Sequence, residues 1–243
     1  MRLCSHLTFL CFLSLSLLSR RLNAAELTPV DWKIDGTTRH ALVHFPAKTN
    51  GAPIIFGFHG HGGSMSFVAR RWHLHELWPE AVVVYPQGLP TKTPRDLEGA
   101  RAGWLMLPST DNRDLKFFDA MLATARNDWR VDTNRVYVTG HSNGGGFTYL
   151  LWGTRGELLA AVAPVAASGG LLLLKAKPCP MLHIGGRNDP IVAFKSQERA
   201  VEAARKVNGT NAPVEFVIHN GGHEYPKDAA AKIVAFFKQH ERK

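Results

Sequence analysis

The clearest indication of the fold is the segment Arg135-Val-Tyr-Val-Thr-Gly-His-Ser-Asn-Gly144. Residues 136–139 are β-branched or aromatic and form a run short enough for a buried strand. Residues 140–144 fit the pattern G-x-S-x-G, and the residues after them can open a helix. A serine on a sharp turn between a strand and a helix is the setting in which a reactive hydroxyl group projects above a sheet. The alternative is a glycine-rich turn with a structural serine, which this context favours less.

Outward from this segment, short apolar runs and helical patterns alternate along the chain. The runs of strand length are 41–45, 53–58, 81–85, 135–139, 160–166, 180–184 and 214–218. Apolar residues at three- and four-residue steps predict helices over about 114–129, 195–206 and 227–240. Strands buried on both faces and alternating with helices imply βαβ units. We therefore expect a single α/β domain with a mostly parallel central sheet that helices cover on both faces.

The composition is that of a folded globular protein. The chain has 243 residues, of which 45% are apolar and 20% are charged, and this excludes intrinsic disorder and a coiled coil for the whole chain. The formal net charge is +9, but the basic residues form no block of five or six like charges. No nucleic-acid recognition motif accompanies the charge, so we expect no nucleic-acid partner.

Residues 1–25 are predicted to be a secretory signal peptide. A positively charged start precedes an apolar run over 7–18, and small residues follow at Ala24 and Ala25. The run is too short to span a bilayer, although two arginines before the cut leave a short uncleaved anchor as the alternative. Cleavage would make residues 26–243 one domain of a secreted or periplasmic protein without stable membrane insertion.

A serine hydroxyl needs a base that accepts its proton and a third group that orients this base. In folds with such a turn, the acid and the histidine follow the serine in chain order, each after a later strand. Asp189 follows the predicted strand 180–184, and His223 follows the predicted strand 214–218. Ser142, Asp189 and His223 are therefore the predicted nucleophile, acid and base. The alternatives are His219 as the base and Asp228 or Glu224 as the acid.

Two backbone N–H groups are expected to hold the negative oxygen of the tetrahedral intermediate. One belongs to Asn143, the residue after the nucleophile. The other belongs to the glycine-rich loop at 59–63, directly after an early strand. We assign this second donor to the His61 N–H, with Gly60 and Gly62 as alternatives.

The paired histidines do not predict a metal site. His59 and His61 lack the Asp and His that a metallohydrolase would carry at positions 63 and 64. His73 and His75 have no further ligand cluster near them in the sequence and are expected on a polar helix or loop face. We therefore expect neither a metal nor an organic cofactor.

The segment 86–112 has no clear period and is rich in Gly, Pro, Thr and Arg. Loops of this length inside compact domains are usually functional or disordered. Because it contains Trp104, we expect a folded loop that forms a wall of the substrate pocket, with Trp104 on that wall. The alternative is a surface excursion without a role.

Taken together, these motifs resemble a known family. The similar stretches are His59-Gly-His-Gly-Gly, Tyr85-Pro-Gln-Gly, the segment around Ser142, Asn188-Asp-Pro-Ile-Val and Gly221-Gly-His-Glu-Tyr-Pro. They look like the secreted polyhydroxybutyrate depolymerase and feruloyl esterase-like group of α/β-hydrolases, over essentially the whole chain after the leader. The resemblance implies an α/β-hydrolase fold and ester hydrolysis through an acyl-enzyme, with the triad at Ser142, Asp189 and His223. One departure is the turn before the acid, which often begins His-Gly in relatives but is Gly185-Gly186 here, and which we expect to loosen the acid loop.

The resemblance implies esters as substrates: feruloyl or aryl, acetyl, or short hydroxyalkanoate esters. We expect a small molecule or an oligomer, including esters linked to a polysaccharide, rather than insoluble polyester. One alternative is a prolyl-oligopeptidase-like serine peptidase or a thioesterase on the same scaffold. The other is a catalytically inactive secreted binding protein, which would have lost at least one of the elements present here. The oligomeric state stays open.

Overall fold

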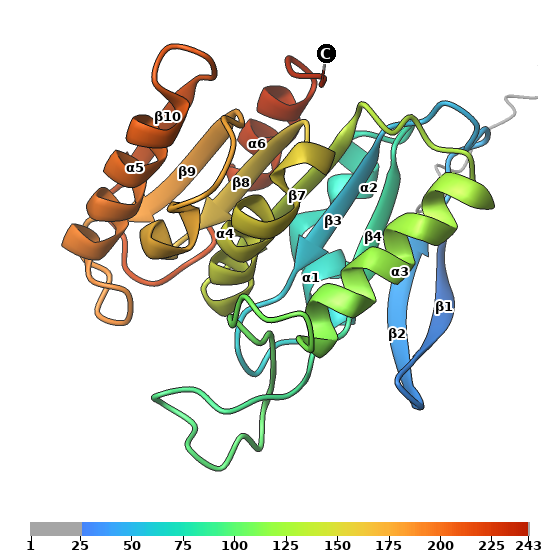
Figure 1. Cartoon of the computed structure of the whole chain (residues 1–243), viewed down its shortest axis with the longest axis horizontal. Coiled ribbons are helices and arrows are strands. Elements are labelled where there is room, and N and C mark those ends of the chain that lie inside the picture. The colour runs from blue at the N-terminus through green and yellow to red at the C-terminus, as the bar shows by residue number, and fades with distance from the viewer. Residues whose placement is uncertain (1–25, 243) are drawn as a thin grey trace, which may run out of the picture.

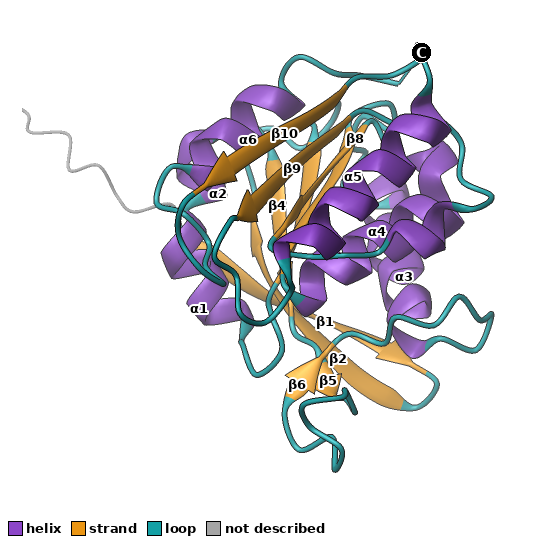
Figure 2. Ribbon diagram, turned by 90° about the vertical axis from the view of Figure 1, so that its left-hand side faces the viewer, coloured by secondary structure: helices purple, strands orange, loops and turns teal. Residues whose placement is uncertain are grey.

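The computed structural model describes residues 26–242, which form an eight-stranded sheet with helices on both faces (Figures 1 and 2). The strand order is β1-β2-β4-β3-β7-β8-β9-β10. The strands are β1 (Leu27–Ile34), β2 (Thr37–His44), β3 (Ile54–Phe58), β4 (Val82–Pro86), β7 (Val136–His141), β8 (Ala161–Val165), β9 (Met181–Gly186) and β10 (Val214–His219). β2 runs antiparallel to both its neighbours, whereas every pairing from β4 through to β10 is parallel.

Helices cover the two faces of the sheet in two groups (Figure 2). One face carries α3 (Arg113–Asn127), α4 (Asn143–Arg155) and α5 (Phe194–Asn208), together with the short 3₁₀ turns η1 (Gly156–Leu158) and η2 (Gly170–Leu173). The other face carries α1 (Met65–Trp72), α2 (Leu74–Leu77) and α6 (Ala229–Phe237). Each face has its own buried apolar cluster. The predicted fold class, a mostly parallel sheet with helices on both faces, is confirmed.

The edge strand β1 and the helices α1 and α2 were not predicted, and each has a physical reason. β1 is mostly exposed, with Trp32 as its one buried residue, and contains Pro29, which an edge strand tolerates because one side of its backbone has no ladder partner. The short helices α1 and α2 lie between two buried strands. α1 begins after Ser64, whose side chain accepts a hydrogen bond from the Phe67 N–H at 3.2 Å. Such local signals are weaker than the continuous apolar runs of buried strands.

The 86–112 loop projects beyond the carboxyl ends of the parallel strands (Figure 1). Its only regular structure is the two-stranded ribbon of β5 (Leu89–Pro90) and β6 (Ala102–Gly103). An ion pair of 2.8 Å between Arg39 and Asp114, both 1% exposed, lies at its base. The other Asp114 oxygen accepts the Leu105 N–H at 2.8 Å. The loop is therefore fastened to the body of the domain.

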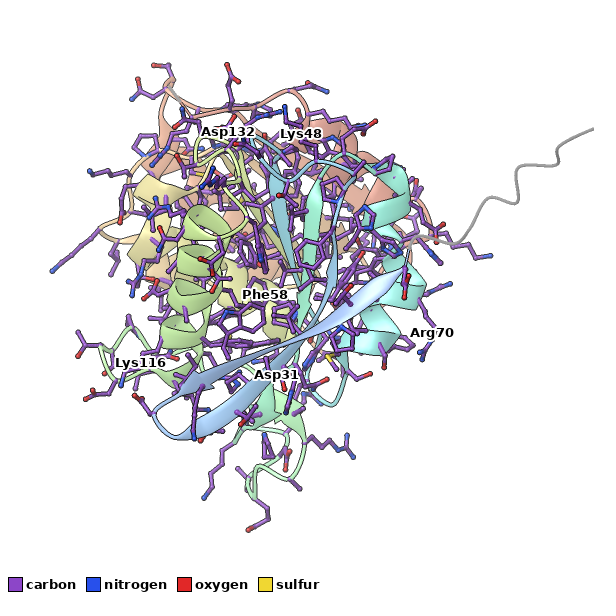
Figure 3. The ribbon with its side chains drawn as sticks, turned by 90° about the vertical axis from the view of Figure 1, so that its right-hand side faces the viewer. Asp31, Lys48, Phe58, Arg70, Lys116 and Asp132 are labelled. Atoms are coloured by element: carbon purple, nitrogen blue, oxygen red, sulfur yellow. The ribbon has the colours of Figure 1, made fainter. Side chains whose placement is uncertain are left out.

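The core extends up to the edge of the sheet from which the loops emerge. Figure 3 shows Phe58, the last residue of β3, in the interior, and Arg70 pointing outward from α1. Within residues 26–242, no helix combines the length and the apolar character that crossing a membrane requires. The predicted signal peptide over residues 1–25 lies outside the described residues.

Candidate active site

Ser142 lies on the turn between β7 and α4 in a strained backbone conformation. Its φ of 56° and ψ of −117° fall in a region that side-chain-bearing residues rarely adopt. Two glycines make the turn possible: a Cβ on Gly140 would lie 2.3 Å from the carbonyl carbon of Gly144, and one on Gly144 would lie 2.2 Å from the Phe58 oxygen. The G-x-S-x-G pattern is therefore a steric requirement of this turn.

Three side chains from the loops after β7, β9 and β10 form one hydrogen-bonded line. Nε2 of His223 lies 2.7 Å from Oγ of Ser142, and Nδ1 of His223 lies 2.9 Å from Oδ2 of Asp189. Because a carboxylate only accepts, Nδ1 carries the proton and Nε2 is left to accept from the hydroxyl. The structure brings together the predicted nucleophile, base and acid in an arrangement that can activate a serine.

The carboxylate of Asp189 is buried and has a partner in every direction. Oδ1 accepts the N–H groups of Ile191 and Val192, both at 2.8 Å. Oδ2 accepts from His223 and, at 3.2 Å, from the amide of Gln197. These hydrogen bonds fix the direction of the carboxylate. Gln197 was not predicted, because it belongs to no motif and lies in the first turn of an ordinary helix.

The two predicted oxyanion donors belong to different elements. Asn143 is the first residue of α4, where the helix leaves its N–H groups without intrahelical partners. In the glycine-rich loop, the Gly62 N–H donates to the Ala102 oxygen at 2.7 Å and is already used. The His61 and Gly60 N–H groups are left as candidates for the second donor.

The 86–112 loop braces the glycine-rich loop through His59. The Gly88 N–H donates to Nε2 of His59 at 2.9 Å, so the proton of this imidazole is on Nδ1, which donates to the Gly60 oxygen at 2.7 Å. Burial lowers the pKa of His59 and favours this neutral form. The indole of Trp104 donates to the His59 oxygen at 2.8 Å. The His59 imidazole therefore has a structural role: it connects the 86–112 loop to the glycine-rich loop.

His61, the second histidine of the glycine-rich loop, makes a further contact with the 86–112 loop. Nε2 of His61 lies 2.9 Å from Oδ2 of Asp96, in the middle of the 86–112 loop. Hydrogen bonds from the N–H of Arg101, from His61 and from the N–H groups of Ala100 and Gly99 lower the pKa of Asp96 to about 2. An ionised Asp96 thus ties the loop tip to the residue that carries the predicted oxyanion donor.

Trp104 was predicted on a wall of the substrate pocket, but it packs into the apolar core. Its side chain is buried, lies edge-on to Phe58 and stacks on Phe147, with ring centroids 5.1 and 5.4 Å apart. Its backbone N–H donates to Oδ1 of Asn143 at 2.6 Å, and its carbonyl oxygen accepts from Nδ2 of Asn143 at 3.0 Å. The indole N–H finds its acceptor inside the fold, so Trp104 clamps the 86–112 loop to the serine turn.

The cavity beside the site lies on another side, between the glycine-rich loop, α1 and the His223 loop. Its volume is about 660 Å³. Trp72 and Tyr225 stack on its wall with ring centroids 4.3 Å apart, and Phe67 of α1 is 57% exposed at its rim. The sequence gives no sign of this cavity, because α1, which forms one of its walls, was not predicted.

The alternative catalytic residues and the second histidine pair have other contacts. His219 accepts the Gly221 N–H at 3.1 Å, Asp228 pairs with Lys232 at the start of α6, and Glu224 lies 3.5 Å from His219. His75, expected on a polar face, is instead buried and lies 2.8 Å from the Tyr85 hydroxyl, and burial lowers its pKa to about 4. In the part of the chain that the structure describes, no group of three or more His, Cys, Asp or Glu could hold a metal.

Comparisons with known proteins point to one family. The family model described as "Dienelactone hydrolase family" matches residues 81–240. A probable feruloyl esterase C from Aspergillus niger is 28% identical over 207 residues, which cover 70% of each chain. A bifunctional acetylxylan esterase/xylanase from Neocallimastix patriciarum is 26% identical over 162 residues, 64% of this chain and 22% of that one. A solved structure of a ferulic acid esterase superposes with a TM-score of 0.69 at 15% identity, covering 88% of this chain and 98% of that chain.

Proposed function

The chain belongs to the dienelactone hydrolase family, and we propose that it is a serine esterase acting through Ser142, His223 and Asp189. That it is a carboxylic ester hydrolase follows from the family and from the esterases to which it is similar. One observation carries the assignment of the triad: His223 bridges the serine hydroxyl and a buried carboxylate with hydrogen bonds of 2.7 and 2.9 Å. The polyhydroxybutyrate depolymerase part of the resemblance stays a prediction.

In the proposed reaction, Nε2 of His223 takes the proton of Ser142 while Oγ attacks the ester carbonyl carbon. The N–H groups of Asn143 and His61 hold the resulting oxyanion. The imidazolium returns the proton to the leaving alcohol oxygen, and the acyl group stays on Ser142. Water then attacks the acyl-enzyme, with His223 again as the base, and releases the acid. Asp189 keeps the imidazole in the required tautomer throughout.

We propose an aromatic acyl group of the feruloyl type as the preferred substrate, with acetyl and short hydroxyalkanoate esters as further substrates. The stacked Trp72–Tyr225 pair and the exposed Phe67 favour a flat aromatic group in the cavity beside His223. The feruloyl and acetylxylan esterases among the relatives support the same substrate class, including esters attached to a polysaccharide.

The first test is hydrolysis of methyl ferulate and p-nitrophenyl acetate by residues 26–243, with Ser142→Ala as the control. We expect turnover by the unaltered protein, faster with methyl ferulate, and none by the variant. Labelling of Ser142 by a fluorophosphonate without turnover of either ester would overturn the proposed preference for these acyl groups. If Ser142 is not labelled and no ester is turned over, the proposed triad is wrong. Faster cleavage of a peptide amide than of either ester would favour a peptidase.

We also propose export with cleavage near Ala24 or Ala25. The support is the sequence of residues 1–25 alone: a charged start, an apolar run and small residues. N-terminal sequencing of the protein recovered outside the cytoplasm tests this. We expect the chain to begin at residue 25 or 26. An uncleaved chain that sediments with membranes would favour the N-terminal anchor instead.

A further inference from the structure

Three buried polar side chains are connected to Asp189 through hydrogen bonds. Gln197 of α5, His183 of β9 and Tyr149 of α4 are all 0% exposed. Burying a polar group is unfavourable unless it has hydrogen-bond partners, and these three side chains find them in one another.

The contacts form an unbroken chain that ends on the carboxylate. The Tyr149 hydroxyl lies 2.9 Å from Nδ1 of His183. Nε2 of His183 lies 3.2 Å from Oε1 of Gln197. Nε2 of Gln197 lies 3.2 Å from Oδ2 of Asp189, the same oxygen that faces His223.

The partners fix the direction of every hydrogen bond in this chain. Nε2 of Gln197 also donates to the Val192 oxygen at 2.8 Å, so the oxygen of the amide faces His183 and can only accept. His183 therefore donates from Nε2 and accepts the Tyr149 hydroxyl at Nδ1. Burial lowers the pKa of His183 to about 4, which favours the neutral imidazole that this arrangement needs. All the donors point toward Asp189.

The two glycines before the acid, Gly185 and Gly186 at the end of β9, belong to the same arrangement. A Cβ on Gly185 would lie 2.5 Å from Oε1 of Gln197 and 3.0 Å from the ring of Phe216. Glycine at this position leaves the space that the amide occupies. Gly185-Gly186, where relatives often have His-Gly, was expected to loosen the acid loop. Gly185 instead leaves room for the Gln197 side chain, whose amide donates to Asp189 in that loop.

We propose that Gln197 is a positioning residue for the acid of the triad, and that His183 and Tyr149 hold its amide in the donating orientation. The proposal rests on the proposed function, because it gives a role to residues behind the proposed Asp189. The amide N–H fixes Oδ2 toward His223 and draws off part of its negative charge.

Loss of the amide has consequences that differ from those of a packing defect. Oδ2 would become a stronger acceptor, which stabilises the imidazolium form of His223 and moves the acid limb of the kcat/KM profile to higher pH. The imidazole would also be less well oriented, which lowers kcat. None of the three side chains lines the cavity beside the site, so KM should stay unchanged.

The test compares Gln197→Met with Asn208→Leu, which removes another buried amide from the same helix. Asn208 is also 0% exposed, and it bonds the backbone of Cys179 at 3.0 and 2.7 Å, away from the triad. For Gln197→Met on p-nitrophenyl acetate we expect kcat to fall about tenfold, KM to change less than twofold, and the acid limb to rise by about half a pH unit. For Asn208→Leu we expect lower thermal stability with unchanged kcat and pH profile.

Tyr149→Phe provides a second variant that keeps the ring and removes one hydroxyl. We expect the acid limb to move in the same direction by a smaller amount, with kcat lowered about twofold. The other titratable groups around His223 are unaltered in all three variants: His141 of β7, with its ring centroid 5.0 Å away, and Glu224 and Tyr225 in the same loop.

The experiments distinguish a failure of the inference about Gln197 from a failure of the proposed function. If Gln197→Met matches Asn208→Leu in kcat and pH profile, the amide only packs, and the inference is wrong. If Gln197→Met does not fold, an unmoved acid limb in Tyr149→Phe overturns the inference. If the unaltered protein neither turns over an ester nor labels at Ser142, the proposed function fails instead.

Discussion

The turn that carries Ser142 and the loop that carries Asp189 are built in opposite ways. The serine is positioned by close backbone contact, with a positive φ and flanking glycines where no Cβ fits. The aspartate is positioned by hydrogen bonds from two backbone N–H groups, an imidazole and a buried amide. The first arrangement depends on backbone shape and tolerates a change of the side chain at position 142. The second depends on side-chain chemistry.

The largest effect is expected at the serine. Ser142→Ala should lower kcat about 10⁴- to 10⁶-fold, yet change the free energy of unfolding by less than about 0.5 kcal/mol. Ser142→Gly should be equally inactive but about 1 kcal/mol more stable than the alanine variant, because glycine adopts a φ of 56° without strain. Turnover of p-nitrophenyl acetate and urea unfolding measure both quantities. A large loss of stability in Ser142→Ala would mean that the hydroxyl is structural.

Substitution of the acid should lower both activity and stability, unlike substitution of the serine. Asp189→Asn should lower kcat about 10⁴-fold and also cost about 2 kcal/mol of stability. Whichever way the new amide turns, its NH₂ group faces N–H donors, either those of Ile191 and Val192 or those of His223 and Gln197. Asp228→Asn is the matched control, since that carboxylate is largely exposed. An Asp189→Asn variant as stable as the unaltered protein would contradict the account of the acid loop.

The two regions also differ in how far the sequence reveals them. The serine turn is a local pattern between a strand and a helix, so Ser142 and its surroundings can be read from adjacent residues. The seven predicted strands lie within a few residues of those observed, and three of them, β3, β4 and β8, are buried along their whole length, as their continuous apolar runs indicate. β1 escaped prediction because an exposed edge strand lacks such a run.

Contacts between distant segments could not be read in this way. Gln197 meets His183 and Asp189 only because α5 packs beside β9, and its sequence neighbourhood gives no sign of the contact. Trp104 was expected at a pocket, since an indole in a loop suggests a surface role. Its N–H acceptor, the His59 oxygen, lies 45 positions away in the sequence and draws the ring inward. Direction of a side chain is a property of the assembled fold.

A methyl group added at Gly144 tests whether close backbone contact positions Ser142. Gly144→Ala would place a Cβ 2.2 Å from the Phe58 oxygen, a backbone atom that cannot move without displacing β3. We expect a loss of about 3 kcal/mol or more in the free energy of unfolding. In Gly222→Ala the nearest atoms would be 3.7 Å away, so this control should unfold within about 0.5 kcal/mol of the unaltered protein. Similar losses in both variants would show that the turn relaxes and that backbone contact does not position Ser142.

The smallest effect concerns acid pH and belongs to the hydrogen-bonded side alone. Burial lowers the pKa of His183 to about 4, whereas an unfolded histidine titrates near 6.5. Below pH 6.5 the unfolded chain therefore takes up a proton that the folded protein does not. The free energy of unfolding decreases as the pH is lowered through this range. From pH 7 to pH 5 this one group accounts for about 2 kcal/mol.

Urea unfolding of His183→Gln at the two pH values isolates this contribution, because glutamine does not titrate. Whatever its stability at pH 7, the variant should lose about 2 kcal/mol less than the unaltered protein between pH 7 and pH 5. An equal fall in His183→Gln and the unaltered protein would mean that folded His183 takes up a proton between these two pH values as readily as the unfolded chain does. At pH 5 both of its ring nitrogens would then donate, and Nδ1 could not accept the Tyr149 hydroxyl.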